Sequence, residues 1–211
     1  MMTASLSATG FVLSRNLTAG GYERLGLLSA QNGFLRPLRR LSSKTENRPC
    51  PDLFDLCSVA LESGRGGAWF LREYEVLRRF SGIGARYEAL EAASDWARLA
   101  GANAPELESC AKVSELTFRF FDALDKGFPV QAVLLKTYYL FAGSEGLPVR
   151  EEWLAGLSSV QRKTADTALR TPLGEVSESA VSFAGLASLN GDVVSWMCRN
   201  HHIVPALRRE S

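Results

Sequence analysis

One stretch of the sequence decides how the fold is interpreted: Gly33-Phe34-Leu35-Arg36-Pro37-Leu38-Arg39-Arg40-Leu41-Ser42-Ser43-Lys44. We call residues 33–44 the basic stretch, because positive charge concentrates here on a predicted strand and on the loop that leaves it. Leucines are interleaved with arginines between residues 34 and 41, which favours a strand. Pro37 cannot donate a hydrogen bond to a neighbouring strand, so we expect this strand to lie at a sheet edge or to be bulged there.

The segments around the basic stretch have the composition of further strands. Turn-forming residues separate them at 16–21, at Asn32-Gly33, which is a strong hairpin signal, and at Gly64-Arg65-Gly66-Gly67. Five short strands without an intervening helix predict a small antiparallel β-barrel. The expected strands span residues 9–15, 22–29, 34–41, 53–61 and 68–80.

Beyond residue 80 the pattern changes to that of helices. Gly101 is typical of a helix end, and Asn103 with the following proline and acid is typical of a helix start. The chain is therefore expected to be α+β, with a strand domain at 1–80 and a helical domain at 81–211. The expected helices span residues 84–100, 103–126, 129–142, 151–170 and 177–200.

The composition of the 211 residues, 46% of them hydrophobic, suits one or two globular domains. No apolar run approaches about 18 residues, so no membrane helix is expected. Residues 1–13 lack a basic start and a long apolar stretch, so no signal peptide is expected either. The four cysteines form no CxxC pair, which argues against a disulfide framework and favours a reducing cytoplasm.

Positive charge is distributed unevenly along the chain. Residues 1–80 carry 11 Lys and Arg against 7 Asp and Glu, whereas residues 81–211 carry 13 against 16. The net charge of +1 therefore conceals an excess of positive charge in the first part. We expect a polyanionic partner to bind the strand domain rather than the helical domain.

Several motifs follow one another in a recognisable order. The strand at 8–15 is followed by Glu23-Arg24-Leu25, and Asn32-Gly33 then leads into the basic stretch. Trp69-Phe70-Leu71-Arg72-Glu73-Tyr74-Glu75-Val76-Leu77 ends the strand region, and residues 134–148 form a helix that ends in a Gly-containing turn and a proline. In order and spacing, these motifs between residues 8 and 150 resemble the RecO family of bacterial recombination mediators.

The resemblance implies an N-terminal OB-fold β-barrel at 1–80 and an α-helical bundle domain at 81–211. It implies a non-enzymatic DNA repair and recombination mediator that binds single- and double-stranded DNA, promotes strand annealing and helps to load RecA. The implied partners are RecR and single-strand-binding protein, with RecA reached indirectly. No cofactor and no membrane are implied, and the location would be cytoplasmic and nucleoid-associated.

The sequence departs from the family pattern in one place. Many RecO proteins carry a four-cysteine zinc site just after the position of Leu147-Pro148. Here that region reads Val149-Arg150-Glu151-Glu152-Trp153 and holds no cysteine. We therefore expect no metal, and a conformation of the C-terminal half that differs from that of the zinc-containing members.

Nucleic-acid binding by an OB barrel uses basic side chains on one sheet face and its flanking loops. Alternation places Arg36 and Arg40 on one face and Arg39 on the other, unless a bulge near Pro37 shifts the phase. The alternative is a solvated edge strand that is basic only to prevent aggregation. The candidate nucleic-acid-binding residues are Arg15, Arg36, Arg39, Arg40, Lys44, Arg48 and Arg65.

The remaining candidate clusters lack residues that a catalytic or metal site needs. The Cys198 and His201-His202 set lacks a second cluster, so a helix end with histidines is the better interpretation. Glu23, with Glu73 and Glu75, lacks a neighbouring nucleophile or metal motif, so these are interpreted as surface charges. Most aromatic side chains of the strand region belong in the core; if one is exposed, we expect Trp69. A diverged protein-interaction module that bridges repair partners without binding DNA is the alternative function.

Overall fold

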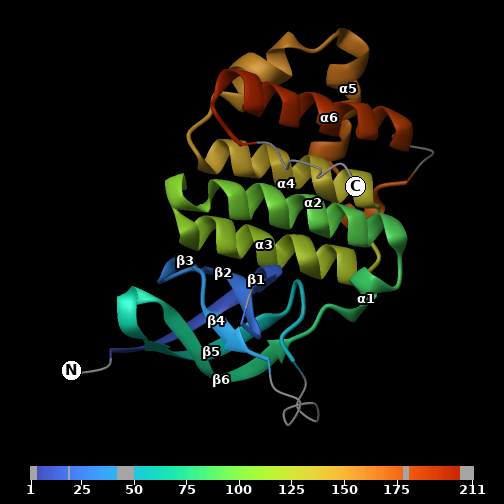
Figure 1. Cartoon of the computed structure of the whole chain (residues 1–211). Helices are drawn as coiled ribbons and strands as arrows, with labels where there is room; N and C mark the ends of the chain where they lie inside the picture. The colour runs from blue at the N-terminus through green and yellow to red at the C-terminus, as the bar shows by residue number, and fades with distance from the viewer. Residues whose placement is uncertain (1–3, 19, 42–49, 178–180, 205–211) are drawn as a thin grey trace. The chain divides into compact units, whose positions relative to one another are not determined.

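The computed structural model describes residues 4–18, 20–41, 50–177 and 181–204. Figure 1 labels the strands and helices, which follow one another as a strand region and then a helical region. The fold is α+β, as the sequence predicts, with a six-stranded sheet followed by helices. The strands are β1 (Ser5–Thr18), β2 (Tyr22–Ser29), β3 (Gly33–Leu35), β4 (Leu38–Arg40), β5 (Leu56–Ser63) and β6 (Trp69–Arg78).

The sheet returns on itself as a ring of strands. Its order is β1-β5-β6-β4-β2-β3, and β1 pairs with β2 in addition to β5. All these pairings are antiparallel except that of β4 with β6, which is parallel where Leu38 lies opposite Phe70. The prediction of a purely antiparallel arrangement is therefore wrong at this contact, where the short β4 meets a strand that is not its hairpin neighbour.

The basic stretch pairs with β2 in one continuous register, although it is divided into β3 and β4. Leu27 lies opposite Leu35, and Arg24 lies opposite Leu38. Two residues separate these paired positions on each strand, so no residue is inserted in either of them. The alternation of side chains between the two faces therefore continues from β3 into β4.

Pro37 explains why the ladder is interrupted between β3 and β4. A proline has no N–H to donate, whereas its carbonyl oxygen accepts a hydrogen bond from the Leu25 N–H at 3.0 Å. The expected edge position fits β3, which is the last strand in the sheet order, whereas β4 lies between β6 and β2. The bulge considered for this position is absent, because the register is the same on both sides.

A hydrophobic core fills the inner side of the ring. Burial raises the pKa of the Cys57 thiol in this core to about 12, so the thiol stays protonated. Trp69, expected to be the exposed aromatic if one is exposed, is half-buried and packs against this core. The buried members are Ala8, Val12, Leu25, Leu27, Cys57, Val59 and Leu61, and Leu6, Leu35, Trp69, Leu71, Tyr74 and Val76 pack against them.

Strand β1 contains a bulge that sets the orientation of its second half. Residues 5–11 pair with β5, and residues 10–18 pair with β2. The register with β2 shifts between Val12 and Ser14, so one extra residue lies in β1 at this point. Because of the extra residue, Arg15 lies opposite the buried Leu25 and shares the inner face with Val12.

The helical region contains six α-helices within the described residues. One of them, α4, buries most of its side chains and lies where a helix is expected at residues 129–142. No helix of the described residues is long and apolar enough to cross a membrane. The helices are α1 (Ser81–Gly84), α2 (Tyr87–Asn103), α3 (Cys110–Asp125), α4 (Val130–Ser144), α5 (Ser159–Arg170) and α6 (Phe183–Asn200).

The single helix predicted at 151–170 is wrong, because the chain forms two separate elements there. A π-helical turn covers η4 (Val149–Leu154), and α5 begins only after Ser158. The Ser158 side chain accepts from the Gln161 N–H, and the Gln161 side chain accepts from the Ser158 N–H at 3.2 Å. This reciprocal capping box starts a new helix at Ser159.

The chain divides into two compact units. One comprises residues 1–80 and 96–115, and the other comprises residues 81–95 and 116–211. Within the first unit, Phe34 of β3 packs close to Gly101, near the end of α2. The domains proposed from the sequence, 1–80 and 81–211, stay a prediction.

Candidate nucleic-acid interface

The outer face of the ring, opposite the core, carries three arginines around one leucine. Arg24 lies directly opposite Leu38, and Arg36 and Arg40 lie two residues to either side of Leu38. Diagonal neighbours of this kind in an antiparallel pair are about 7–8 Å apart. We call Arg24, Arg36 and Arg40 the arginine cluster. The register alone brings them together.

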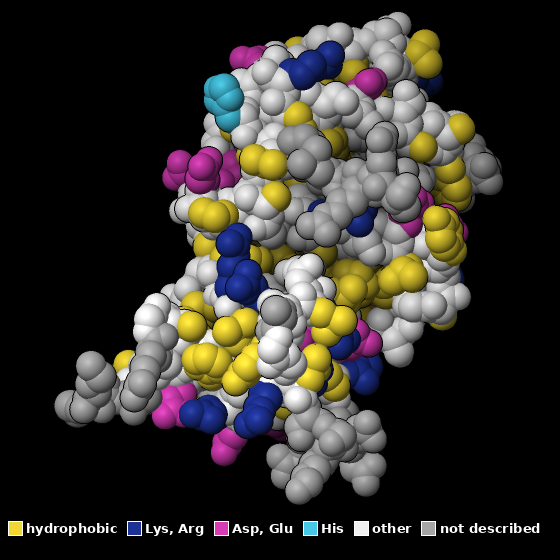
Figure 2. Space-filling view, in the orientation of Figure 1, with side chains coloured by type: hydrophobic (Ala, Val, Ile, Leu, Met, Phe, Trp, Pro, Cys, Tyr) yellow, Lys and Arg dark blue, Asp and Glu magenta, His cyan; other side chains and the backbone are white. Residues whose placement is uncertain are grey.

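The charges of the arginine cluster are exposed and uncompensated within the described residues. All three side chains are exposed, and none of them takes part in an ion pair found in the described part of the chain. The Arg36 guanidinium lies over the Phe34 ring, 5.5 Å from its centroid. Figure 2 shows Lys and Arg side chains among hydrophobic ones over the strand region. The cluster is therefore a cationic surface with apolar side chains between its charges.

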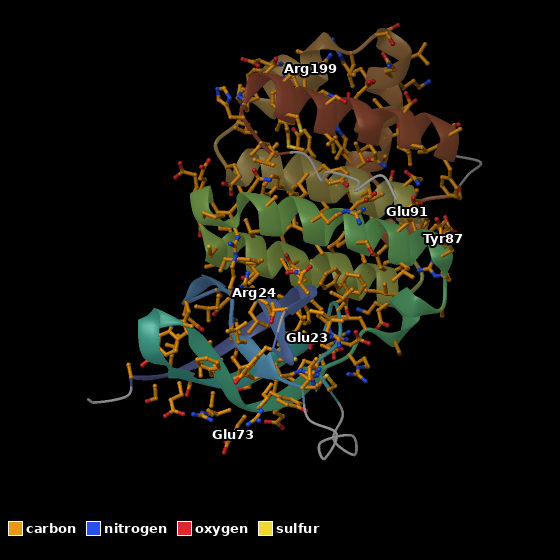
Figure 3. All side chains as sticks on the ribbon, in the orientation of Figure 1. Glu23, Arg24, Glu73, Tyr87, Glu91 and Arg199 are labelled. Carbon is orange, nitrogen blue, oxygen red and sulfur yellow. The ribbon has the colours of Figure 1, made fainter. Side chains whose placement is uncertain are left out.

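Arg24 belongs to the cluster, although it is not among the seven candidate residues chosen from the sequence. A signal for it exists. Alternation along residues 22–29 places Arg24 on the face opposite to Leu25 and Leu27, and the Asn32-Gly33 hairpin brings it beside the basic stretch. Figure 3 labels Arg24 and its neighbour Glu23, of which Arg24 is exposed and Glu23 is buried.

Two aromatic side chains lie on the same outer face. Tyr22 is opposite Arg40, and Phe70 is opposite Leu38. Their rings meet edge to face, with centroids 5.8 Å apart and an angle of 66° between the planes. Both side chains are half-buried, so each keeps part of its ring accessible. Phe70, rather than Trp69, is the aromatic of β6 that shares a face with arginines.

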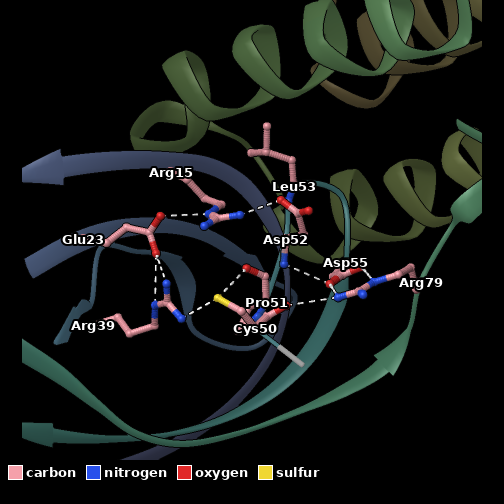
Figure 4. A network of polar contacts seen from close by, with 9 residues as sticks. All are labelled: Arg15, Glu23, Arg39, Cys50, Pro51, Asp52, Leu53, Asp55 and Arg79. Carbon is pink, nitrogen blue, oxygen red and sulfur yellow. Dashed lines mark hydrogen bonds and ion pairs between the residues drawn. The ribbon is translucent and has the colours of Figure 1, made fainter. Parts of the chain in front are cut away.

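Arg15 and Arg39 take a different position, on the inner side of the ring. Glu23 lies between them and accepts from Arg15 Nε at 2.9 Å and from Arg39 Nη2 at 2.8 Å (Figure 4). Arg39 also donates to Cys50 Sγ. The Glu23 residue is only 4% exposed, so its interpretation as a surface charge is wrong. The register turns Glu23 inward, where two guanidinium groups compensate its charge.

The same network continues to a second buried carboxylate. Asp55 is 1% exposed and is bound by two nitrogens of Arg79, at 3.0 and 2.7 Å. Asp55 also accepts from the Asp52 N–H at 2.9 Å, and Asp52 in turn binds Arg15 Nη1 at 2.6 Å (Figure 4). Three guanidinium groups thus meet three carboxylates, and the network as a whole is neutral.

The network lowers the pKa of Asp52, which is one of its exposed members. Burial raises the pKa of Asp52, but the Leu53 N–H and the Arg15 guanidinium bind its charged form and outweigh the burial. The pKa of the Asp52 carboxyl therefore lies below its ordinary value. Asp52 stays ionised at neutral pH and keeps Arg15 in place.

For the three remaining candidate nucleic-acid-binding residues, the structure describes no side chain. Lys44 and Arg48 fall within residues 42–49, outside the described residues. Arg65 begins the short turn η2 (Arg65–Gly67) between β5 and β6, and its backbone alone is described. Gly66 and Gly67 adopt φ values of 80° and 78°, which confirms the predicted glycine-rich hairpin tip.

The histidine pair follows the end of α6. His201 Nε2 lies 3.5 Å from a carboxylate oxygen of Glu152, and its ring meets Trp196 edge to face at 4.5 Å. The described residues contain no group of three or more His, Cys, Asp or Glu side chains that could hold a metal ion. These contacts account for His201 as a packed side chain near a helix end.

A second group of cations lies on the exposed side of α5. A hollow of about 450 Å³ is lined by Ser159, Arg162, Lys163, Asp166, Thr167 and Arg170. Arg162 is fixed by a hydrogen bond from its guanidinium to the Leu157 carbonyl oxygen at 3.3 Å. No aromatic side chain lines this hollow within the described residues, which distinguishes it from the outer face of the ring.

Comparison with known proteins does not extend this description. No protein-family model matches the chain, and no curated protein matches it. The resemblance to the RecO family thus rests on the motifs and their order.

Proposed function

We propose that this chain binds nucleic acid through the arginine cluster on the outer face of the strand ring. The observation that carries the proposal is the unbroken register between β2 and the basic stretch, which gathers Arg24, Arg36 and Arg40 on one exposed face. These guanidinium groups have no acidic partner among the described residues, and such groups attract phosphates, which release their condensed counterions on binding. Contacts of this kind hold the backbone and do not depend on base sequence.

We infer that the strand ring is an OB-fold barrel. The pairing of β1 with both β2 and β5, around one core, supports this inference. If β3 and β4 are counted as one interrupted strand, then β2 and the basic stretch are the second and third strands. OB folds bind oligonucleotides on the face of these two strands, which is the face that carries the arginine cluster.

The motif order supports a more specific role as a recombination mediator resembling RecO. In that role the cluster screens the repulsion between phosphates, so that complementary strands come close enough to anneal. RecR, single-strand-binding protein and, indirectly, RecA are the proposed partners, and the nucleoid is the proposed location. The protein performs no covalent chemistry in this scheme.

Two charge-reversal variants test the proposal. We expect Arg36→Glu/Arg40→Glu to weaken binding of a labelled oligonucleotide of about 16 nucleotides at least about tenfold at low salt, measured by fluorescence anisotropy. The same variant should no longer speed up the annealing of two complementary strands. The control Arg150→Glu/Lys163→Glu makes the same change in net charge at two exposed positions in the helical region.

Each outcome separates the proposed function from its alternatives. Loss in the cluster variant alone supports binding at this face. Equal loss in both variants would show attraction by net charge without a defined site. Unchanged affinity in the cluster variant, or absence of binding by the unmodified chain, would contradict the proposal and favour a protein-interaction module.

A further inference from the structure

Tyr22 and Phe70 approach each other across the outer face from strands that are not neighbours. Tyr22 lies on β2 and Phe70 on β6, and β4 lies between these strands. Leu38 of β4 is opposite Phe70, so the two rings meet next to the leucine at the centre of the arginine cluster. An edge-to-face pair of half-buried rings leaves part of the aromatic surface open on this face.

The position of the Phe70 ring is fixed by its surroundings. Gly64 precedes the turn between β5 and β6, and a Cβ atom there would lie 2.3 Å from the Phe70 ring. The ring therefore occupies space that only a glycine leaves free. With Gly64 on one side and the Tyr22 ring against it, the Phe70 ring is held in place before any ligand arrives.

Positive charge surrounds this aromatic pair. Arg40 is the cross-strand neighbour of Tyr22, and Arg24 lies one step further along the sheet from Phe70, beyond Leu38. A nucleic-acid backbone bound by these arginines would carry its bases across the two rings. Aromatic surfaces next to phosphate-binding side chains are the arrangement by which proteins bind unpaired strands.

We propose that Tyr22 and Phe70 form a stacking platform for an unpaired base, so that the outer face selects single-stranded over double-stranded nucleic acid. This inference rests on the proposed function, because the arginine cluster must hold the backbone. Selection follows because the faces of bases in a duplex are covered by their neighbours, whereas an unpaired base offers its face to a ring.

Substitution of each ring by leucine tests the platform. The probes are one labelled oligonucleotide of about 16 nucleotides and the duplex of the same sequence, measured by fluorescence anisotropy. We expect Tyr22→Leu and Phe70→Leu each to weaken single-strand binding by about fivefold or more, and duplex binding by less than about twofold. Tyr22→Phe should retain the preference, because it keeps the ring.

A control and an independent readout complete the test. Tyr87 is 80% exposed on α2, and Tyr87→Leu should leave both affinities unchanged. With the unmodified chain, a 2-aminopurine base in the single strand should lose fluorescence on binding as it stacks. This readout does not depend on the folding of any variant.

Three results would overturn the inference. These are equal affinity of the unmodified chain for strand and duplex, equal weakening of both by the leucine variants, or unchanged 2-aminopurine fluorescence. If the arginine variants lose binding while the leucine variants keep the preference, only the platform is wrong. If the arginine variants also bind normally, the proposed function fails as well.

Discussion

Glu23 binds Arg15 and Arg39, two of the arginines predicted from the sequence as candidates for DNA binding. The residue is 4% exposed, and both Arg15 and Arg39 bind its carboxylate. A carboxylate at this depth requires such partners, because an unpaired buried charge is strongly destabilising. The two guanidinium groups therefore stabilise the fold of the ring, whereas Arg36 and Arg40 point their charge outward.

Neutralising Glu23 should weaken the fold. We expect Glu23→Gln to lower the free energy of unfolding by about 1–3 kcal/mol, because two partly buried guanidinium groups lose their charged acceptor. Urea denaturation monitored by circular dichroism measures the change. Glu73→Gln is the matched control on exposed β6 surface, and it should change stability by less than about 0.5 kcal/mol. Equal effects of the two substitutions would show that the network contributes nothing.

The depressed pKa of Asp52 predicts a dependence of stability on pH. The folded state stabilises the ionised form of the Asp52 carboxyl. The contribution of Asp52 to the free energy of unfolding is therefore fully present above the pKa of Asp52 in the unfolded chain, and it is lost as the pH falls through the lower pKa of the folded state. Asp52→Asn should therefore lose less stability than the unmodified chain between pH 7 and about pH 3. The control is Asp192→Asn, at an exposed position of α6. An identical loss in Asp52→Asn and the unmodified chain would contradict the account.

At the scale of elements, the closure of the ring depends on the close approach of β1 to β2. A Cβ atom at Gly10 would lie 2.7 Å from the Leu28 carbonyl oxygen, which is a backbone atom of the paired strand. We expect Gly10→Ala to destabilise the protein by about 1–3 kcal/mol, because the two backbones must move apart. Thermal or urea unfolding checks this.

At a second glycine, Gly143, we expect substitution by alanine to stabilise the protein. Gly143 lies in α4, and a Cβ atom there would meet nothing within 4 Å. Gly143→Ala should stabilise the protein by about 0.5–1 kcal/mol, because it removes backbone freedom from the unfolded chain. A Gly10→Ala variant as stable as Gly143→Ala would mean that β1 and β2 are not packed as described.

Local signals predicted some boundaries and missed others. Gly101, expected to end a helix, lies inside α2, and α3 begins at Cys110 and not near Asn103, so the helix signals there were wrong. Asn32-Gly33 marks the turn before β3, and Gly33 adopts a φ of 70° as the hairpin requires. Pro37 marks the break before β4. The bulge after Val12 has no comparable signal, because it depends on β1 pairing with β5 and then with β2.

The candidate site was predictable to the extent that it follows from alternation along one hairpin. Arg36 and Arg40 share a face because the register is unbroken. Glu23 lies directly opposite Arg39 in the same register and is eight residues from Arg15, across the pairing of β1 with β2. The bulge in β1, which sets the face of Arg15, and the contact of Arg15 with the distant Asp52 depend on the folded ring. Alternation along the same hairpin thus places Arg39 beside Glu23 and away from Arg36 and Arg40, whereas no local pattern marks the bulge that turns Arg15 inward.

At the scale of the whole molecule, the net charge of +1 says little about where a polyanion binds. In the network around Glu23 and Asp55, three cations and three anions compensate one another. The arginine cluster has no such compensation among the described residues. The account therefore ascribes the affinity for nucleic acid to three side chains and not to the overall charge.

The dependence of binding on salt tests this central claim most directly. Each phosphate contact to a single strand contributes about 0.7 to the slope of log K against log salt concentration, so three contacts contribute about 2. We predict that Arg24→Ala/Arg36→Ala/Arg40→Ala reduces the steepness of that slope by about 2. Arg150→Ala/Lys163→Ala should leave it unchanged. An unchanged slope in the triple variant would contradict the claim that the arginine cluster holds the backbone.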